Sequence, residues 1–164
     1  MKILLILRHA KSSWKDSELP DQQRPLNKRG KKDAPRIGKW LREQDLVPDV
    51  ILCSSAARAR STARAVIEES GFDGEMLVND EFYANPEAET FYDELSRLPD
   101  EVECAMVVGH NPSLEELVED LTSEYVRLPT AALAQINLPI QNWWAMANGV
   151  QGSLVQVWRP KENS

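Results

Sequence analysis

Residues 4–14 read LLILRHAKSSW and place an arginine and a histidine directly after a run of aliphatic side chains. The run starts at residue 1 as MKILLIL, and an unbroken aliphatic segment of this length is typical of a strand buried on both faces. The chain has one other histidine, His110, which follows a second aliphatic run in AMVVGHNP at 105–112. Both histidines are therefore predicted to lie at the ends of buried strands.

The length and composition are those of a single globular domain spanning residues 1–164, with 42% hydrophobic and 27% charged residues. The net charge of −7 argues against a nucleic-acid-binding surface, which needs clustered basic residues. The same charge argues against docking on anionic membranes. A small anionic substrate stays compatible with it, because a local basic pocket can lie within an acidic protein.

The sequence favours a cytoplasmic location. No apolar segment approaches the roughly 20 residues that a membrane-spanning helix needs. Residues 1–7 are too short for the core of a signal peptide. Cys53 and Cys104 could form a disulfide, but without a secretion signal we expect two reduced thiols in buried strands.

Strand and helix patterns alternate along most of the chain, which predicts an α/β three-layer sandwich with a largely parallel central sheet and helices on both faces. Further strands are expected at 50–53, 76–78, 105–108, 133–138 and 153–158. Helices are expected at 28–43, at 57–70, at 87–98 and from Asn111-Pro112 to about 121. Ser54-Ser55 and Asn111 are expected to cap the helices that follow them.

Three of the predicted strand ends carry residues suited to a phosphate group. Arg8 and His9 end the first strand, Arg58 lies in the first helical turn after the second, and His110 ends the fourth. In open α/β sheets ligands bind beyond the carboxyl ends of the strands, so these side chains are expected to meet in one pocket. Arginine offers a planar fork that matches phosphate oxygens, and helix N-termini add partial positive charge.

A histidine beside a bound phosphoryl group can attack phosphorus and form a phosphohistidine. Attack needs a neutral imidazole, and nearby arginines favour that form by charge repulsion. The second histidine, if protonated, could stabilise the equatorial oxygens. Two histidines could instead hold a metal ion, but no spaced Cys, His or Asp cluster accompanies them, and we expect neither a metal nor a cofactor.

The chain resembles the histidine phosphatase superfamily, the phosphoglycerate-mutase-like group, from about residue 2 to residue 158. The motifs are LRHAKSSW at 7–14, RPLNKRG at 24–30, CSSAARARST at 53–62 and VVGHNP at 107–112. The small size, Ala10, RPLNKRG and LPTAALA at 128–134 look most like the SixA-type phosphohistidine phosphatases.

The resemblance implies that His9 is the nucleophile, that Arg8 and Arg58 bind the phosphoryl group and that His110 completes the pocket. Many superfamily members also carry an acidic residue after the third strand, which protonates an alkoxide leaving group. Asp80 and Glu81 are the candidates for that general acid here, with no fixed register.

Neighbouring residues are expected to complete the pocket. The resemblance implies supporting roles for Ser55 and Thr62. Substrate-binding roles are expected for four residues beside the two histidines: Lys11, Ser12, Ser13 and Asn111. The loop 10–26 is expected to wall the entrance, where Trp14 is either a platform for substrate or an anchor of the loop.

These observations favour a metal-independent phosphatase that removes phosphate from phosphohistidine in a protein and releases inorganic phosphate. A phosphoramidate nitrogen leaves easily once protonated, whereas an alkoxide depends more on an acid. Three alternatives stay open: a phosphomonoesterase acting on sugar or nucleotide phosphates, a non-catalytic module that binds a phosphorylated ligand, and a metal-dependent hydrolase.

Overall fold

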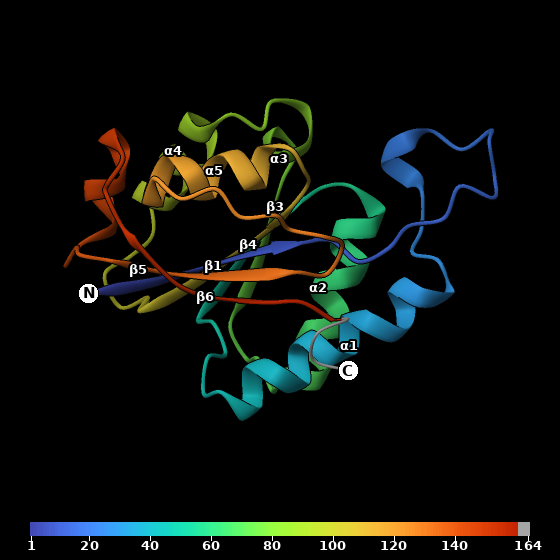
Figure 1. Ribbon diagram of the computed structural model, residues 1–164, viewed down its shortest axis with the longest axis horizontal. Helices are drawn as coiled ribbons and strands as arrows, with labels where there is room; N and C mark the ends of the chain where they lie inside the picture. Colours follow the sequence, from blue (N-terminus) through green and yellow to red (C-terminus); the bar gives the residue numbers. More distant parts are fainter. Residues whose placement is uncertain (161–164) are drawn as a thin grey trace.

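The computed structural model describes residues 1–160, in which six strands form one sheet in the order β3-β2-β4-β1-β5-β6 (Figure 1). The strands are β1 Lys2–Arg8, β2 Val50–Ser54, β3 Glu75–Asn79, β4 Cys104–Gly109, β5 Leu133–Leu138 and β6 Ser153–Trp158. The first four strands in the chain run parallel to one another, and β5 is antiparallel to both β1 and β6. The predicted α/β fold with a largely parallel sheet is confirmed.

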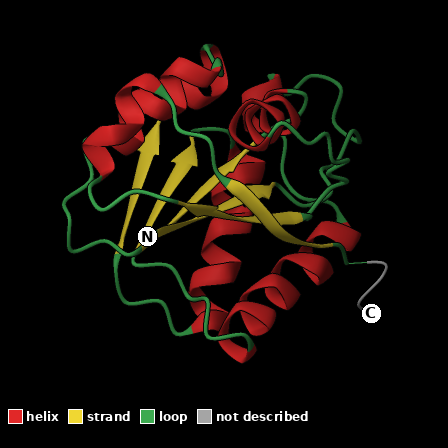
Figure 2. Ribbon diagram, turned by 60° about the vertical axis from the view of Figure 1, so that its left-hand side comes forward, coloured by secondary structure: helices red, strands yellow, loops and turns green. Residues whose placement is uncertain are grey.

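Helices cover both faces of the sheet (Figure 2). The helices are α1 Lys28–Glu43, α2 Ala57–Ser70, α3 Glu81–Ala84, α4 Ala88–Ser96 and α5 Ser113–Thr122, with short 3-10 helices η1 Asp21–Gln23 and η2 Trp143–Asn148. Alternate residues of the central strands point into two separate apolar cores, one against α1 and α2, the other against α4, α5 and η2. The three-layer arrangement explains why residues 3–7 of β1 are all aliphatic and why β4 has no charged side chain.

The strand register brings the two histidines to one edge of the sheet. Arg8 at the end of β1 pairs with Gly109 at the end of β4, and Cys53 near the end of β2 pairs with Val108. The residues that follow these three strands therefore emerge side by side, as predicted from the parallel order.

The region after β3 differs from the prediction of one helix at 87–98. A short helix, α3, begins at Glu81, and the backbone N–H of Asn85 closes its last turn on the Glu81 carbonyl. Pro86 separates it from α4, because proline cannot donate to a helical hydrogen bond. A four-residue helix is too short to show a helical period in its sequence, so no pattern indicated α3.

Three polar residues predicted as helix caps have other partners. The N-cap of α2 is Ala56, while Ser54 Oγ accepts from the Ala56 N–H and Ser55 Oγ accepts from Gln22. The N-cap of α5 is Pro112, after a cis peptide bond from Asn111, whose side-chain amide donates elsewhere. The capping predictions for Ser54-Ser55 and Asn111 were therefore wrong. All three side chains form hydrogen bonds with residues distant in the sequence.

Both cysteines are buried free thiols, as expected, and burial raises the pKa of each to about 12. Across residues 1–160, no helix combines the length and apolar character that crossing a bilayer requires.

The loop 10–26 is fastened against the start of α1. Ser12 pairs with Leu26 in an isolated antiparallel bridge, and the Asn27 N–H donates to the Lys11 carbonyl. A Cβ added at Gly30 would lie 2.1 Å from the same Lys11 carbonyl oxygen. The glycine of the RPLNKRG motif therefore allows the backbone that follows His9 to lie directly on α1.

We predict that Gly30→Ala destabilises the protein by about 1–3 kcal/mol, because the loop backbone must move away from the helix. Urea unfolding measures the change. Lys39→Ala, at an exposed position of the same helix, serves as the control and should alter stability by only a few tenths of a kcal/mol. Equal stability of the two variants would contradict the close contact.

Candidate active site

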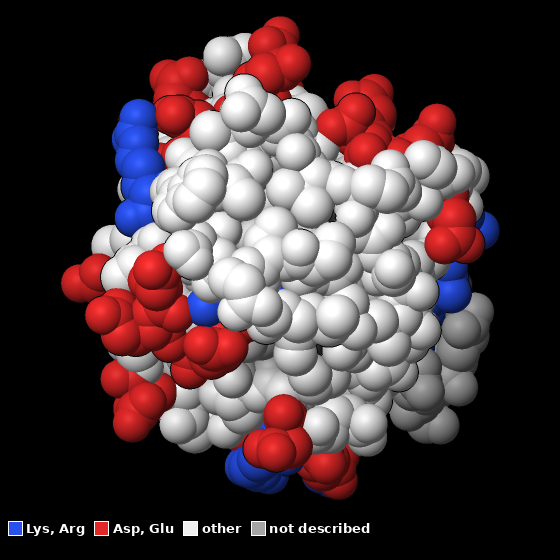
Figure 3. Space-filling model, turned by 90° about the vertical axis from the view of Figure 1, so that its left-hand side faces the viewer, with Lys and Arg blue, Asp and Glu red and all other residues white. Residues whose placement is uncertain are grey.

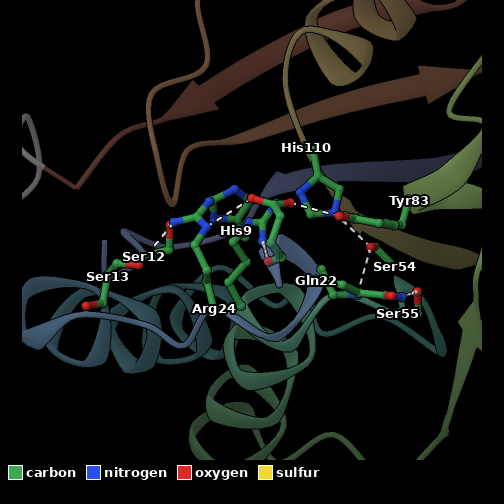
Figure 4. Close-up of polar contacts among 12 residues, drawn as sticks. His9, Ser12, Ser13, Gln22, Arg24, Ser54, Ser55, Tyr83 and His110 are labelled. Atoms are coloured by element: carbon green, nitrogen blue, oxygen red, sulfur yellow. Dashed lines mark hydrogen bonds and ion pairs between the residues drawn. The ribbon is translucent and has the colours of Figure 1, made fainter. Parts of the chain in front are cut away.

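The carboxyl edge of the sheet brings Arg8, His9, Arg58 and His110 to one hollow of about 230 Å³. The two imidazole rings lie 5.2 Å apart between centroids, at an angle of 54° (Figure 4). The other lining residues are Lys11, Ser12, Trp14, Arg24, Asn111 and Thr130. The structure thus gathers the four residues that the sequence assigned to catalysis.

His9 is held in one orientation by its backbone and by its ring. Its N–H donates to the Gly109 carbonyl and its carbonyl accepts from Ala131, which ties it to the strands on either side. Its Nδ1 lies 2.7 Å from the Ala10 carbonyl oxygen. A carbonyl can only accept, so Nδ1 carries the proton and the neutral ring has its lone pair on Nε2.

Thr62 fixes the peptide that orients His9. Its hydroxyl accepts from the Ala10 N–H at 3.0 Å and donates to the Arg58 carbonyl at 2.7 Å. The side chain is fully buried on α2. One hydroxyl therefore links the end of β1 to the helix that carries Arg58, which agrees with the supporting role expected for Thr62.

Both histidines are neutral in this site near pH 7. Burial, together with smaller contributions from the charges of Arg58 and Arg8, lowers the pKa of His9 to about 3, although the hydrogen bond to the Ala10 carbonyl raises it. Burial, followed by the charge of Arg58, lowers the pKa of His110 to about 4. The expected neutral state of His9 agrees, although burial contributes more than the arginines. The expected protonation of His110 is wrong for the protein without a bound anion, because burial disfavours the charged ring.

His110 is positioned by two residues that the sequence did not indicate. Its Nε2 lies 2.7 Å from Ser54 Oγ at the end of β2. The ring of Tyr83 from α3 meets the imidazole edge-on, at 5.8 Å between centroids (Figure 4). These contacts fix the ring and leave its other nitrogen, Nδ1, without a protein partner.

Asp21, in η1 of the loop, joins two arginines of the site. The Asp21 carboxylate accepts from Arg58 Nη2 at 2.9 Å and from Arg24 Nε at 3.0 Å, and its backbone carbonyl accepts from Arg58 Nη1. Tyr83 donates its hydroxyl to the same carboxylate. Burial alone would raise the pKa of Asp21, but hydrogen bonds from Tyr83, Arg58 and Arg24 outweigh it and hold the pKa well below its usual value.

Arg8 is oriented by the segment before β5. Its Nη1 donates to the Leu128 carbonyl at 3.1 Å, and the Asn111 amide donates to the same oxygen at 2.7 Å. Further along this segment, Ala131 adopts a left-handed backbone with a φ of 65° and donates its N–H to His9. Such a backbone is unfavourable for a residue with a Cβ and persists where surrounding contacts enforce it.

Unpartnered polar atoms concentrate at this hollow. Within residues 1–160, five buried side-chain nitrogen or oxygen atoms have no hydrogen-bond partner, and four belong to residues that line it. The four are Arg8 Nε, Arg58 Nε, His110 Nδ1 and Asn111 Oδ1. An unsatisfied buried polar group costs roughly 1–3 kcal/mol, so three such nitrogens together favour a ligand with several acceptor oxygens.

One of the four predicted substrate-binding residues lies outside the hollow. Lys11, Ser12 and Asn111 line the hollow, whereas Ser13 lies outside it, and its carbonyl accepts from Arg24. Trp14 also lines the hollow and is 73% exposed, with the Arg24 guanidinium 3.6 Å from its ring centroid. Trp14 is therefore no buried anchor of the loop.

The two candidate general acids lie away from the hollow. Asp80 and Glu81 are exposed at the start of α3, and neither lines the cavity that contains His9. Asp80 accepts a hydrogen bond from Gln22, which also donates to Ser55. These contacts link the loop to the end of β2 and bring neither carboxylate to the histidines.

Sequence reasoning missed Asp21, Arg24, Ser54 and Tyr83. Arg24 belongs to the RPLNKRG motif, which was the one available signal for it. Asp21 depends on how the loop 10–26 folds back, and Tyr83 lies on a helix too short to show a period. Ser54 lies in the CSSAARARST motif, but only the fold shows that His110 is beside it. Within the described part of the chain, no group of three or more His, Cys, Asp or Glu is placed to hold a metal ion. Metal independence stays a prediction.

Comparison with known proteins agrees with this geometry. The model of the histidine phosphatase superfamily, branch 1, matches residues 4–103. An uncharacterised chloroplastic protein of Arabidopsis thaliana is 32% identical over 160 residues, covering 91% of this chain and 72% of the relative. An uncharacterised protein of Mycobacterium tuberculosis is 36% identical over 117 residues, covering 71% of this chain and 70% of the relative.

Solved structures named for the phosphohistidine phosphatase SixA are similar over nearly the whole chain. One from Agrobacterium tumefaciens has a TM-score of 0.82 at 28% identity and covers 97% of this chain and 98% of its own. A SixA structure complexed with tungstate has a TM-score of 0.84 at 22% identity and covers 99% of both chains, a likeness of fold. On the family match and these relatives, the chain belongs to the histidine phosphatase superfamily, branch 1.

Proposed function

We propose that this protein hydrolyses phosphohistidine in a partner protein through a phosphorylated His9. The observation that carries the proposal is the state of His9, whose Nδ1 donates to the Ala10 carbonyl and whose Nε2 lone pair is therefore available. Unpartnered nitrogens of Arg8 and Arg58 border the same hollow and suit phosphoryl oxygens. A nucleophile and an anion clamp are thus combined in one cavity.

The reaction proceeds in two displacements. His9 Nε2 attacks phosphorus, and the phosphorus–nitrogen bond of the substrate breaks. The substrate ring leaves as neutral imidazole when its second nitrogen already carries a proton. Water then attacks phospho-His9, releases inorganic phosphate and returns His9 to its neutral form. Arg8 and Arg58 bind the oxygens in both steps, and His110 Nδ1 faces the developing charge when it carries a proton.

The acid–base character of the site supports a phosphoramidate over a phosphate ester. No Asp or Glu lines the hollow within the described residues. Asp21, the carboxylate that contacts the arginines, is held ionised and is a poor proton donor. An alkoxide leaving group needs such a donor, whereas a phosphohistidine ring that already carries a proton on its second nitrogen does not. The likeness to structures named for SixA supports the same substrate class.

The test compares turnover of a histidine-phosphorylated protein with that of a panel of sugar and nucleotide phosphates. We expect the phosphoramidate to be preferred, and we expect vanadate to inhibit. His9→Ala should reduce turnover by a factor of at least about 1,000, since it removes the nucleophile. Wild-type protein quenched during turnover should carry an acid-labile, alkali-stable phosphoryl group on His9.

Lys39→Ala, remote from the hollow, is the control and should keep full turnover. Full activity of His9→Ala would contradict the proposed mechanism. Preference for an ester would point to a phosphomonoesterase, and tight vanadate binding without turnover of any substrate would point to a binding module.

We predict that Asp21→Asn lowers kcat/KM by roughly tenfold or more, because hydrogen bonds between charged groups contribute about 1.5–3 kcal/mol and asparagine cannot pair with both arginines. Steady-state kinetics and the affinity for inorganic phosphate measure the effect. Asp16→Asn, on the exposed part of the same loop, should leave both unchanged. Tighter phosphate binding by Asp21→Asn would mean that Asp21 competes with the anion instead of orienting the arginines.

We also predict that stability falls as the pH drops below about 6.5. The folded-state pKa values of His9 and His110, about 3 and about 4, lie below the ordinary value of 6.5, so the unfolded chain binds more protons in this window. Each histidine then lowers the free energy of unfolding by at most about 1.4 kcal/mol per pH unit.

Urea unfolding between pH 7.5 and 4.5 tests this. The double variant His9→Asn/His110→Asn should lose less stability over that range than the wild type. The two proteins have the same carboxylates, so the difference between them reports the histidines alone. Superimposable pH profiles would show that the buried imidazoles do not resist protonation.

A further inference from the structure

Two surface grooves lie near the catalytic hollow, and the second shares lining residues with it. The first, about 1270 Å³, runs along the start of α1, between that helix and residues 13–15 of the loop. The second, about 800 Å³, shares Arg8, Lys11, Asn111 and Thr130 with the hollow and reaches Arg29 on α1. Arg29 borders both grooves, so the hollow and the two grooves form one continuous surface.

This surface is strongly basic, although the chain as a whole has 26 acidic and 19 basic residues. Within residues 1–160, twelve Lys and Arg side chains line the hollow or one of the grooves, against two acidic ones. Both acidic residues have partners in the fold. Asp33 pairs with Arg29 and Arg36, and Glu115 accepts from the Leu128 N–H.

Five lysines of this surface are exposed and take part in none of the ion pairs formed within residues 1–160. Together with the exposed Arg29 they define what we call the basic face: Lys11, Lys15, Lys28, Arg29, Lys31 and Lys32. Because the fold does not use these lysine charges, they are available to a partner.

The side of the molecule opposite the basic face has a different charge pattern. The start of α1 and the loop 10–26 lie on the right in Figure 1, at the carboxyl edge of the sheet. Figure 3 shows the opposite side, where acidic side chains surround a broad uncharged area and few basic ones are visible. In the described part of the chain, the side opposite the hollow therefore carries no comparable basic face.

We propose that the basic face docks an acidic surface of the protein that presents the phosphohistidine, an inference that rests on the function proposed above. A folded partner with its phosphorylated side chain in the hollow would cover the adjoining grooves. A protein partner fits better than a nucleic acid, because the hollow accommodates one phosphoryl group and the chain as a whole carries a net charge of −7. Clustered charges of this kind chiefly accelerate association and select partners.

The experiment uses two synthetic peptides with one phosphohistidine each, flanked by glutamates in the first and by lysines in the second, and free phosphohistidine as the small substrate. We expect the wild type to prefer the glutamate-flanked peptide by at least tenfold in kcat/KM at low salt. Lys31→Glu/Lys32→Glu should abolish or reverse the preference. Both lysines lie near the N-terminus of α1, where glutamate is compatible with the helix dipole.

The matched control is Lys39→Glu/Arg64→Glu, which reverses two exposed charges that line neither groove. It should keep the wild-type preference, and raising the salt concentration should weaken that preference in both proteins. All three proteins should cleave free phosphohistidine at equal rates.

The proposal would be overturned if the control variant lost the preference for the glutamate-flanked peptide to the same extent. It would also be overturned if Lys31→Glu/Lys32→Glu kept that preference. Micromolar binding of an RNA oligonucleotide that is lost in Lys31→Glu/Lys32→Glu, with no preference between the peptides, would overturn it in favour of a nucleic acid. If the wild type cleaves phosphate esters but none of the phosphohistidine substrates, the proposed function itself fails.

Discussion

The hydrogen bond from His9 Nδ1 to the Ala10 carbonyl is the contact on which the chemistry of the site depends. A carbonyl partner fixes the tautomer, and the tautomer decides which nitrogen can act as a nucleophile. The bond joins neighbouring residues, but its geometry depends on a distant one. Thr62 on α2 accepts a hydrogen bond from the Ala10 N–H and so fixes the Ala10 peptide. The orientation of one imidazole is therefore determined by the packing of a helix against a strand.

The sheet supplies the rest of the rigidity. His9 continues β1 and is bonded to residues on both sides, Gly109 at the end of β4 and Ala131 just before β5. The side chains of residues 4–7 in β1 are fully buried in the two cores, which holds the strand in place. Burial also keeps both imidazoles neutral, which a nucleophile needs and which costs stability at low pH.

The site residues at the ends of parallel strands could be predicted from the sequence, whereas those on loops and short helices could not. Parallel strands that end in Arg8-His9 and Gly109-His110 must place those residues at one edge, so their convergence follows from the chain pattern. Asp21 and Tyr83 reach the site through a loop and a one-turn helix, neither of which has a period that can be recognised. Ser54 looked like a helix cap, because a serine before a helix usually is one, and only the fold shows that His110 lies beside it.

The balance of charge in the site changes when an anion binds. Asp21 neutralises part of the charge of Arg58 and Arg24, whereas Arg8 has only carbonyl and more distant carboxylate neighbours. A phosphoryl dianion in the hollow would offset that remaining charge, and an adjacent negative charge raises the pKa of an imidazole. His110, neutral in the protein alone, would thereby gain affinity for a proton when phosphate is bound, and the mechanism proposed above uses that charged form to stabilise the equatorial oxygens. In the proposed mechanism, substrate binding and protonation of His110 are therefore linked, and the bound anion gives the neutral site its charged donor.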